Sequence, residues 1–233
     1  MQEIIVSLVT LTILEIVLGI DNIIFISILS NKLPLNQHKK ARNYGLIIGM
    51  VIRVIMLLGI NWVQQQENDL FIILGNGISG KDLLLIGGGL FLLYQSVHEI
   101  HIKMKGVEEG VENKTSAKKF SAVLFQMGII NIVFSLDSII TAIGMVNNVW
   151  VMITAVVISM IIMLVASEPI ATFVNQNPSI KILALAFLVL IGVSLLAEGL
   201  GQHLDKGYIY FAMAFSFTLE LINLRLDKQK ENK

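Results

Sequence analysis

Two segments of the chain carry acidic, amide and hydroxyl side chains at matching positions inside otherwise apolar sequence. In register, these positions hold Glu15, Asp21 and Asn22 in residues 15–24, and Asn131, Asp137 and Ser138 in residues 131–140. Such oxygen ligands are chemically hard and favour Mn²⁺, Mg²⁺ or Ca²⁺ over Cu(I) or Zn²⁺. The absence of cysteine excludes thiolate ligands and disulfides. The repeated pattern therefore predicts a site for a hard divalent cation, although ligand type alone does not choose among the three.

The apolar surroundings of these segments indicate a membrane protein. Hydrophobic residues make up 55% of the 233 positions and charged residues 15%, whereas soluble domains carry about 25% charged residues. The mean hydropathy of +0.77 agrees with this interpretation. Seven runs reach the length of about 20 apolar residues that a helix needs to cross the hydrocarbon core. The predicted spans are residues 4–30, 44–63, 82–100, 120–145, 149–168, 180–201 and 207–224.

The three prolines support this segmentation. Pro34, Pro169 and Pro178 each lie at or beyond the end of a predicted helix, where a missing N–H costs little. The first apolar run is kept as a mature helix because it lacks the basic leading region and small-residue cleavage site of a signal peptide. Glu15 and Asp21 in its middle also argue against a signal peptide.

The two polar segments predict an inverted repeat. They fall in the first and fourth predicted helices, three spans apart, so they cross the membrane in opposite directions. Such repeats place the substrate site near the midplane, where the two copies meet. We predict one all-α, polytopic transmembrane domain over residues 1–233, with seven transmembrane helices as a 3+3 inverted repeat plus one additional helix. Its parts are repeat A at about 4–100, a cytoplasmic linker at 101–119, repeat B at about 120–201 and the seventh helix at about 207–224.

The distribution of basic residues predicts the orientation of the chain. With the N-terminus outside, 14 of the 17 lysines and arginines fall on the inner side, Lys81 and Lys206 fall outside, and Arg53 lies within the second helix. Cytoplasmic loops of membrane proteins carry an excess of basic residues. We therefore predict an outside N-terminus and a cytoplasmic C-terminus. The lipid bilayer, rather than a nucleic-acid partner, accounts for the basic loops.

The spacing within the first segment raises a geometric problem. Positions six apart on a regular α-helix point about 240° apart, so Glu15 and Asp21 cannot share a face. We predict a break near Gly19, because glycine tolerates unwound or kinked backbone. A weaker break is predicted near Ser135 in the second segment. The polar groups of both segments would then converge on one cavity.

If both helices remain regular, a different set of side chains shares each face. Glu15 then lies on one face with Asn22, and Asn131 lies with Ser138, at a spacing of seven. Buried carboxylates cost about 2.5–3.5 kcal/mol each on insertion scales and by default mark an ion or proton path. The structural alternative is hydrogen bonding between helices or a salt bridge to Arg53, although a single arginine cannot neutralise three acids.

Glu220 is a further acidic residue with a supporting role in this hypothesis. With Asn223 it forms an i, i+3 pair at the inner end of the seventh predicted helix, and residues at this spacing share a helix face. Two interpretations stay open. Either the pair lines an inner vestibule, or Glu220 is simply solvated near the membrane interface.

These motifs resemble those of the TerC family of integral membrane proteins, within the LysE-like transporter superfamily. Besides the paired segments, the resemblance rests on Ala41-Arg42-Asn-Tyr-Gly and on Gly199 with Gly207-Tyr-Ile-Tyr-Phe-Ala. It implies a bacterial inner-membrane exporter of Mn²⁺, some relatives being tied to tellurite resistance or to metal loading of secreted enzymes. It also implies that Asp21 and Asp137 are the central ligands. Longer relatives carry a C-terminal soluble module with CBS repeats, and this chain resembles the short form without it.

The leading hypothesis is a secondary transporter that exports Mn²⁺ by alternating access, with no cofactor and no enzymatic activity. Asp21 and Asp137 bind the ion in this hypothesis. Glu15 and Asn131 complete its oxygen shell, and one carboxylate takes up a proton as the ion leaves. The chain has no ATP-binding motif, so an ion gradient supplies the energy. The alternative is a non-transporting membrane partner for maturation or metal loading of exported proteins, in which the external residues 64–80 matter more than the acids. The sequence leaves the oligomeric state open.

Overall fold

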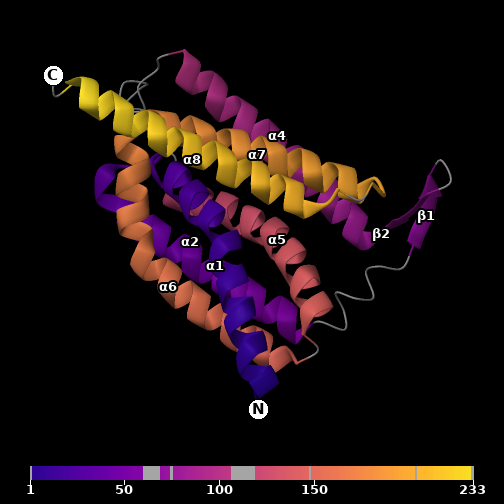
Figure 1. Ribbon diagram of the computed structural model, residues 1–233. Coiled ribbons are helices and arrows are strands. Elements are labelled where there is room, and N and C mark those ends of the chain that lie inside the picture. The colour runs from indigo at the N-terminus through magenta and orange to yellow at the C-terminus, as the bar shows by residue number, and fades with distance from the viewer. Residues whose placement is uncertain are drawn as a thin grey trace.

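The computed structural model describes residues 2–59, 69–73, 76–105, 119–146, 148–202 and 204–231. These residues form seven α-helices and one β-hairpin (Figure 1). The helices are α1 (Gln2–Ser30), α2 (Leu35–Leu58), α4 (Gly80–Met104), α5 (Phe120–Met145), α6 (Val149–Gln176), α7 (Pro178–Gly199) and α8 (Lys206–Glu231). The prediction of an all-α membrane protein with seven helices is confirmed.

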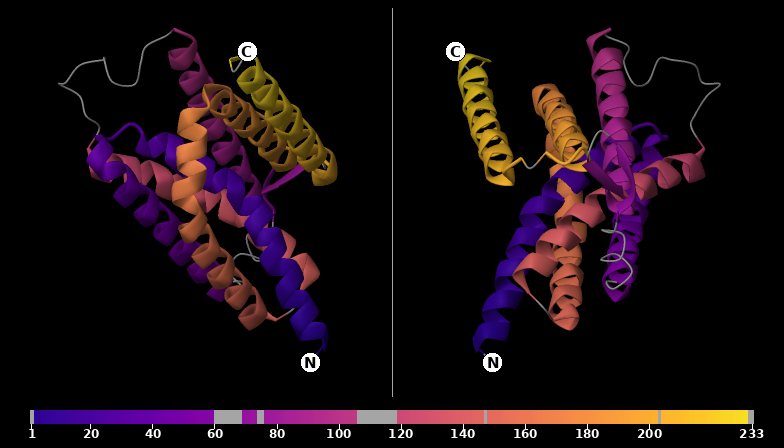
Figure 2. Two further views of the ribbon diagram at one scale, coloured as in Figure 1. Left: turned by 60° about the vertical axis from the view of Figure 1, so that its left-hand side comes forward. Right: turned by 90° about the vertical axis from the view of Figure 1, so that its right-hand side faces the viewer.

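The helices have the length and composition of membrane spans. Six of them, α1, α2, α4, α6, α7 and α8, are long and apolar enough to cross a bilayer, and α5 contains a shorter apolar stretch, Phe120–Leu136. Seven spans place the two ends of a chain on opposite sides of a bilayer. The N- and C-termini do lie at opposite ends of the bundle (Figure 2).

Two helices begin or end away from the predicted limits because polar residues interrupt the apolar run but not the helix. α2 begins at Leu35, well before the predicted start near residue 44. Its first turns carry lysines and an arginine, and the backbone hydrogen bonds of a helix do not depend on apolar side chains. α4 likewise continues to Met104, so the predicted linker at 101–119 begins with the last turn of this helix.

α6 passes through Pro169 and ends only at Gln176, so the prediction that Pro169 ends a helix is wrong. Pro169 has no N–H to donate to the carbonyl oxygen of Val165 four residues earlier, and membrane helices tolerate such interruptions. Two hydroxyls donate to neighbouring carbonyl oxygens rather than to this one. The hydroxyl of Ser167 donates to the carbonyl oxygen of Leu164 at 2.8 Å. The hydroxyl of Thr172 donates to the carbonyl oxygen of Glu168 at 2.9 Å.

Each helix of the first predicted repeat packs mainly against a helix of the second predicted repeat. α1 packs mainly against α6, α2 packs mainly against α5, and α4 packs most extensively against α7. Two halves related by an approximate two-fold axis pack in this way, with α1, α2 and α4 corresponding to α5, α6 and α7. Figures 1 and 2 show α1, α2, α5 and α6 as one group, with α4, α7 and α8 as a second group beside it. The exact limits of the repeats remain a prediction.

Glycines allow α4 and α7 to approach closely. A Cβ atom added at Gly89 of α4 would lie 2.7 Å from the carbonyl oxygen of Gly192 in α7. At Gly199, near the end of α7, it would lie 2.8 Å from the carbonyl oxygen of Asp82. Small residues bring helix backbones together in membrane proteins, where packing replaces the hydrophobic effect between helices. The α4–α7 contact therefore depends on positions that have no side chain.

A short hairpin precedes α4. Strand β1 (Asp69–Ile73) pairs antiparallel with β2 (Asn76–Ser79). Ser79 then caps α4, because its hydroxyl accepts from the amide of Asp82 at 3.2 Å while the Asp82 carboxylate accepts from the amide of Ser79 at 2.9 Å. This capping box joins the hairpin directly to the helix. The remainder of the predicted external segment 64–80, residues 64–68 and 74–75, lies outside the described residues.

Candidate functional site

Both helices that carry the polar segments are regular, so the predicted breaks near Gly19 and Ser135 are wrong. Gly19 serves close packing instead, because a Cβ at this position would overlap the sulfur of Met163 in α6. In α5, the hydroxyl of Ser135 donates to the carbonyl oxygen of Asn131 one turn earlier, so it is satisfied within the helix. The small residues thus fit helices together rather than unwind them.

The regular helices place the polar residues as the alternative prediction expects. Glu15 and Asn22 are both buried, with 3% of each residue exposed, and they lie on one face of α1. Asn131 and Ser138 are buried in the same manner on α5. Asp21 lies on a different part of the α1 surface and is half-buried. Glu15 and Asp21 therefore face different surroundings.

Glu15 forms a buried ion pair with Arg53 of α2. The Arg53 Nη1 atom donates to the Glu15 Oε2 atom at 2.5 Å, and 2% and 3% of the two side chains are exposed. Arg53 Nε is also buried and has no hydrogen-bond partner among the described residues. The pair corresponds to the salt bridge considered as the structural alternative. Because Arg53 balances its charge, Glu15 adds no net negative charge to the middle of the bundle.

Asp21 lines a cavity of about 50 Å³ near this pair. The cavity also receives Arg53 from α2, Ser138 from α5 and Tyr210 from α8. Its apolar walls are Leu18, Phe134 and Ile191. None of the three ion pairs found among the described residues includes Asp21. The cavity thus joins an acid from the first polar segment to a hydroxyl from the second, with an arginine beside them.

The two asparagines differ in how their amides are satisfied. Asn131 Nδ2 donates to the carbonyl oxygens of Gly45 at 3.2 Å and of Met127 at 2.9 Å, which ties α5 to α2. The Oδ1 atom of the same side chain packs against Gly49, where an added Cβ would lie 2.5 Å away. Asn22 has neither kind of contact, because its Nδ2 and Oδ1 atoms are both buried without a partner among the described residues. Buried polar groups are normally hydrogen-bonded, so Asn22 stands out.

The predicted ligand set is only partly assembled by the described side chains. Asp21 and Ser138 share the cavity, and Glu15 reaches it only through Arg53. The side chain of Asp137 lies outside the described part of the structure, although its backbone belongs to α5. Glu220 of α8 is half-buried and is not among the cavity residues. Within the part that is described, no three His, Cys, Asp or Glu side chains gather as a metal site.

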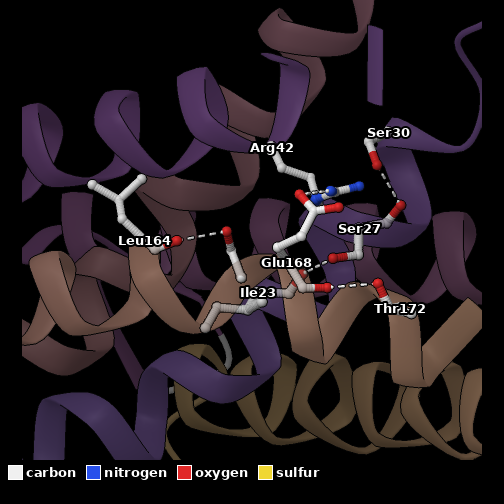
Figure 3. A network of polar contacts seen from close by, with 8 residues as sticks. Ile23, Ser27, Ser30, Arg42, Leu164, Glu168 and Thr172 are labelled. Atoms are coloured by element: carbon white, nitrogen blue, oxygen red, sulfur yellow. Dashed lines mark hydrogen bonds and ion pairs between the residues drawn. The ribbon is translucent and has the colours of Figure 1, made fainter. Parts of the chain in front are cut away.

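A second polar cluster lies at the end of the bundle where α1 ends and α2 begins. Arg42 Nη2 of α2 and Glu168 Oε2 of α6 are 2.7 Å apart, and the guanidinium is buried while the carboxylate is half exposed. Figure 3 shows this pair with Ser27 and Ser30 of α1 beside it. The hydroxyls of these serines donate to carbonyl oxygens of α1 itself. The Arg42–Glu168 pair therefore links the second helices of the two predicted repeats.

Further polar contacts join other helices at this end. Lys32, just after α1, pairs with Glu99 of α4. Gln95 donates to the same carboxylate at 2.6 Å and accepts from Gln126 of α5 at 2.7 Å. Sequence reasoning missed this network and the Arg42–Glu168 pair, because acids near helix ends are often solvated. The signal in the sequence was the position of Glu99 and Glu168 at the ends of the predicted apolar spans 82–100 and 149–168.

Seven apolar helices around a buried polar centre define a polytopic integral membrane protein. Comparison with known families agrees, since the match to the family described as integral membrane protein TerC covers residues 1–233. The chain belongs to the TerC family. No solved structure matches it.

Three relatives illustrate the similarity. A UPF0053 protein of Haemophilus influenzae is 48% identical over 221 residues, which cover 95% of this chain and 93% of the relative. The UPF0053 inner membrane protein YgdQ of Escherichia coli is 47% identical over 220 residues, covering 94% and 92%. The inner membrane protein YoaE of Escherichia coli is 45% identical over 217 residues, which cover 93% of this chain but 42% of that longer relative.

Proposed function

We propose that this protein is a secondary transporter that exports a divalent metal cation from the cytoplasm, with Mn²⁺ as its first candidate substrate, in exchange for protons. The observation that carries the proposal is the cavity between the helices that Asp21 of the first polar segment and Ser138 of the second both line. Inverted repeats bind substrate where their two copies meet. Acids within membrane spans mark ion paths by default.

The charge balance of the site supports a divalent substrate. Arg53 pairs with Glu15, so these two charges cancel. Asp21 then remains as a negative charge in the cavity without an ion-pair partner among the described residues, and the proposal takes Asp137 of the second polar segment as the second acid. One divalent cation balances two carboxylates, and hard oxygen ligands suit Mn²⁺. Asp21 and Asp137 are the proposed central ligands, and Ser138, which lines the same cavity as Asp21, supplies a further oxygen.

The proposal includes location and direction. The two Escherichia coli relatives are named as inner membrane proteins, and the same location is proposed here. The excess of lysine and arginine at the end of the bundle that carries the C-terminus supports a cytoplasmic C-terminus and an outside N-terminus. One of the two aspartates takes up a proton as the metal leaves. Neither a cofactor nor an enzymatic activity is part of the proposal.

Flux measurements in liposomes test it. The purified chain is reconstituted, and Mn²⁺ uptake is followed with and without a pH gradient for the wild type and for the Asp21→Asn, Asp137→Asn double variant. We expect wild-type flux that the gradient accelerates and that the double variant lacks. Asp205→Asn, which makes the same chemical change at an exposed position before α8, is the matched control. Absence of wild-type flux of Mn²⁺, Mg²⁺ and Ca²⁺ by a folded protein contradicts the proposal.

A second candidate function is a membrane partner for maturation or metal loading of exported proteins. The folded hairpin between α2 and α4 favours it, because β1 and β2 form a structured element outside the long helices. Replacing residues 69–79 with a flexible linker of equal length separates the two candidates. Loss of metal in exported enzymes with normal Mn²⁺ flux supports the partner function, whereas loss only in the Asp21→Asn, Asp137→Asn variant supports transport.

A further inference from the structure

Arg53 lies between two carboxylates that face different parts of the bundle. Its Nη1 atom contacts Glu15, and its side chain lines the cavity that contains Asp21. Glu15 and Asp21 are six positions apart on a regular helix, so they cannot turn to one another. The arginine side chain is the group that touches both environments.

The guanidinium of Arg53 has a buried donor that Glu15 does not use. An arginine carries five N–H donors in a planar fork, and one of them is engaged by Glu15. Nε is buried without a partner among the described residues. The whole residue is 1% exposed, so bulk solvent does not reach this donor. Asp21 lines the same cavity as Arg53 and is a second carboxylate in its surroundings.

We propose that Arg53 is a tethered counter-cation that alternates between Glu15 and Asp21 and competes with the metal ion for Asp21. This inference rests on the proposed function. When Arg53 contacts Asp21, the acid is balanced without metal. When Arg53 contacts Glu15, as it does in this structure, Asp21 is open to a cation. Glu15 then acts by holding the arginine away, and it is not a ligand.

Competition of this kind has a measurable signature. Removing the charge of Glu15 takes away the second partner of Arg53 and leaves the arginine on Asp21. The apparent affinity for a ligand equals the intrinsic affinity multiplied by the fraction of molecules that can bind it. If Arg53 contacts Asp21 in about nine molecules of ten, only one in ten can bind the metal, and the apparent affinity is about tenfold weaker. Removing Arg53 as well abolishes the competitor. The second substitution therefore restores the binding that the first one weakens.

Mn²⁺ binding to the purified protein tests whether Arg53 competes with the metal for Asp21. The electron paramagnetic resonance signal of free Mn²⁺ gives the affinity for wild type, Glu15→Gln, Arg53→Gln and the double variant. The Asp21→Asn variant tests whether the measured Mn²⁺ binding depends on Asp21. The matched control is the other arginine–glutamate pair of α2, in which the arginine is buried and the glutamate half exposed, measured as Glu168→Gln, Arg42→Gln and their double variant. Circular dichroism and size-exclusion chromatography verify folding.

We expect Glu15→Gln to bind Mn²⁺ about tenfold more weakly than wild type. The Glu15→Gln, Arg53→Gln double variant should return to within about twofold of wild type, the usual scatter of independent effects. The Arg42 and Glu168 variants should bind as wild type does. If Glu15→Gln alone does not fold, Arg53→Gln and the double variant decide, since both should bind at least as tightly as wild type.

Two results overturn the inference while leaving the proposed function in place. A double variant as weak as Glu15→Gln makes Glu15 a direct ligand, and unchanged binding by Glu15→Gln removes its influence altogether. Wild-type protein whose Mn²⁺ binding does not depend on Asp21 overturns the proposed function itself. The Asp21→Asn measurement therefore distinguishes the two failures.

Discussion

Glu15 of α1 and Arg53 of α2 form an ion pair inside the helix bundle, with Oε2 and Nη1 2.5 Å apart and both side chains buried. The pair lies next to the cavity that contains Asp21. A buried ion pair contributes little by itself, but removing one partner leaves an uncompensated charge in apolar surroundings. The pair thus controls both the stability of the bundle and the net charge at its centre.

Arg53→Met should destabilise the protein strongly. The substitution keeps an unbranched side chain but leaves Glu15 buried without its partner, a change that costs about 3–5 kcal/mol in proteins. The Glu15→Leu, Arg53→Met double variant should be close to wild type, because no buried charge remains. Reversible unfolding in mixed detergent micelles, followed by circular dichroism, gives both values. A double variant as unstable as Arg53→Met would contradict the explanation.

Asn22→Leu should stabilise the fold. Both amide atoms of Asn22 are buried without partners among the described residues, and an unsatisfied buried polar group costs about 1–3 kcal/mol. Leucine has a similar shape and removes that cost. Reversible unfolding of the variant and of the wild type in the same mixed micelles measures the difference, and a variant less stable than the wild type would refute this expectation.

Gly89→Ala should weaken the contact between α4 and α7. The new Cβ would lie 2.7 Å from the Gly192 carbonyl oxygen and 2.9 Å from the Leu196 amide nitrogen, both backbone atoms that cannot move alone. Overpacking of this kind costs about 1–3 kcal/mol. Gly87→Ala is the matched control two positions away, because nothing lies within 4 Å of its added Cβ. Equal unfolding midpoints for the two variants would show that the close approach is unimportant.

The Arg42–Glu168 pair should show energetic coupling between α2 and α6. Arg42→Gln and Glu168→Gln each remove half of a contact of 2.7 Å, so the double variant should lose less than the sum of the two. Side chains in direct contact have coupling energies of about 0.5–3 kcal/mol. A double-mutant cycle on unfolding free energies measures this coupling. Strict additivity would mean that the pair does not hold the two helices together.

Much of the fold could be predicted because a bilayer imposes simple requirements on sequence. A spanning helix must be about 20 residues long and predominantly apolar, so hydrophobic runs located all seven helices. The limits were less predictable where polar turns continue a helix, as at Leu35, or where a helix continues through a proline, as at Pro169. The hairpin before α4 was not predicted from the pattern of residues 64–80.

The ligand set predicted from the two polar segments stays a prediction, and the structure adds contacts that the sequence did not indicate. The sequence predicted that Glu15, Asp21, Asn131 and Asp137 converge, whereas among the described side chains Asp21 and Ser138 line one cavity. The break at Gly19 was predicted from local geometry alone. Packing against Met163 provides a different reason for that glycine, and it involves a residue that a single helix does not contain.

The amino-acid sequence by itself determined the class of protein, the number of helices and the positions of the polar groups, since hydrophobic length and residue type are local properties. Only the tertiary structure decided which acid Arg53 neutralises. Glu15 and Arg53 are separated by 38 positions and by a turn between antiparallel helices. Their pairing depends on how those helices rotate and pack, and charge interactions in apolar surroundings change steeply with distance and burial.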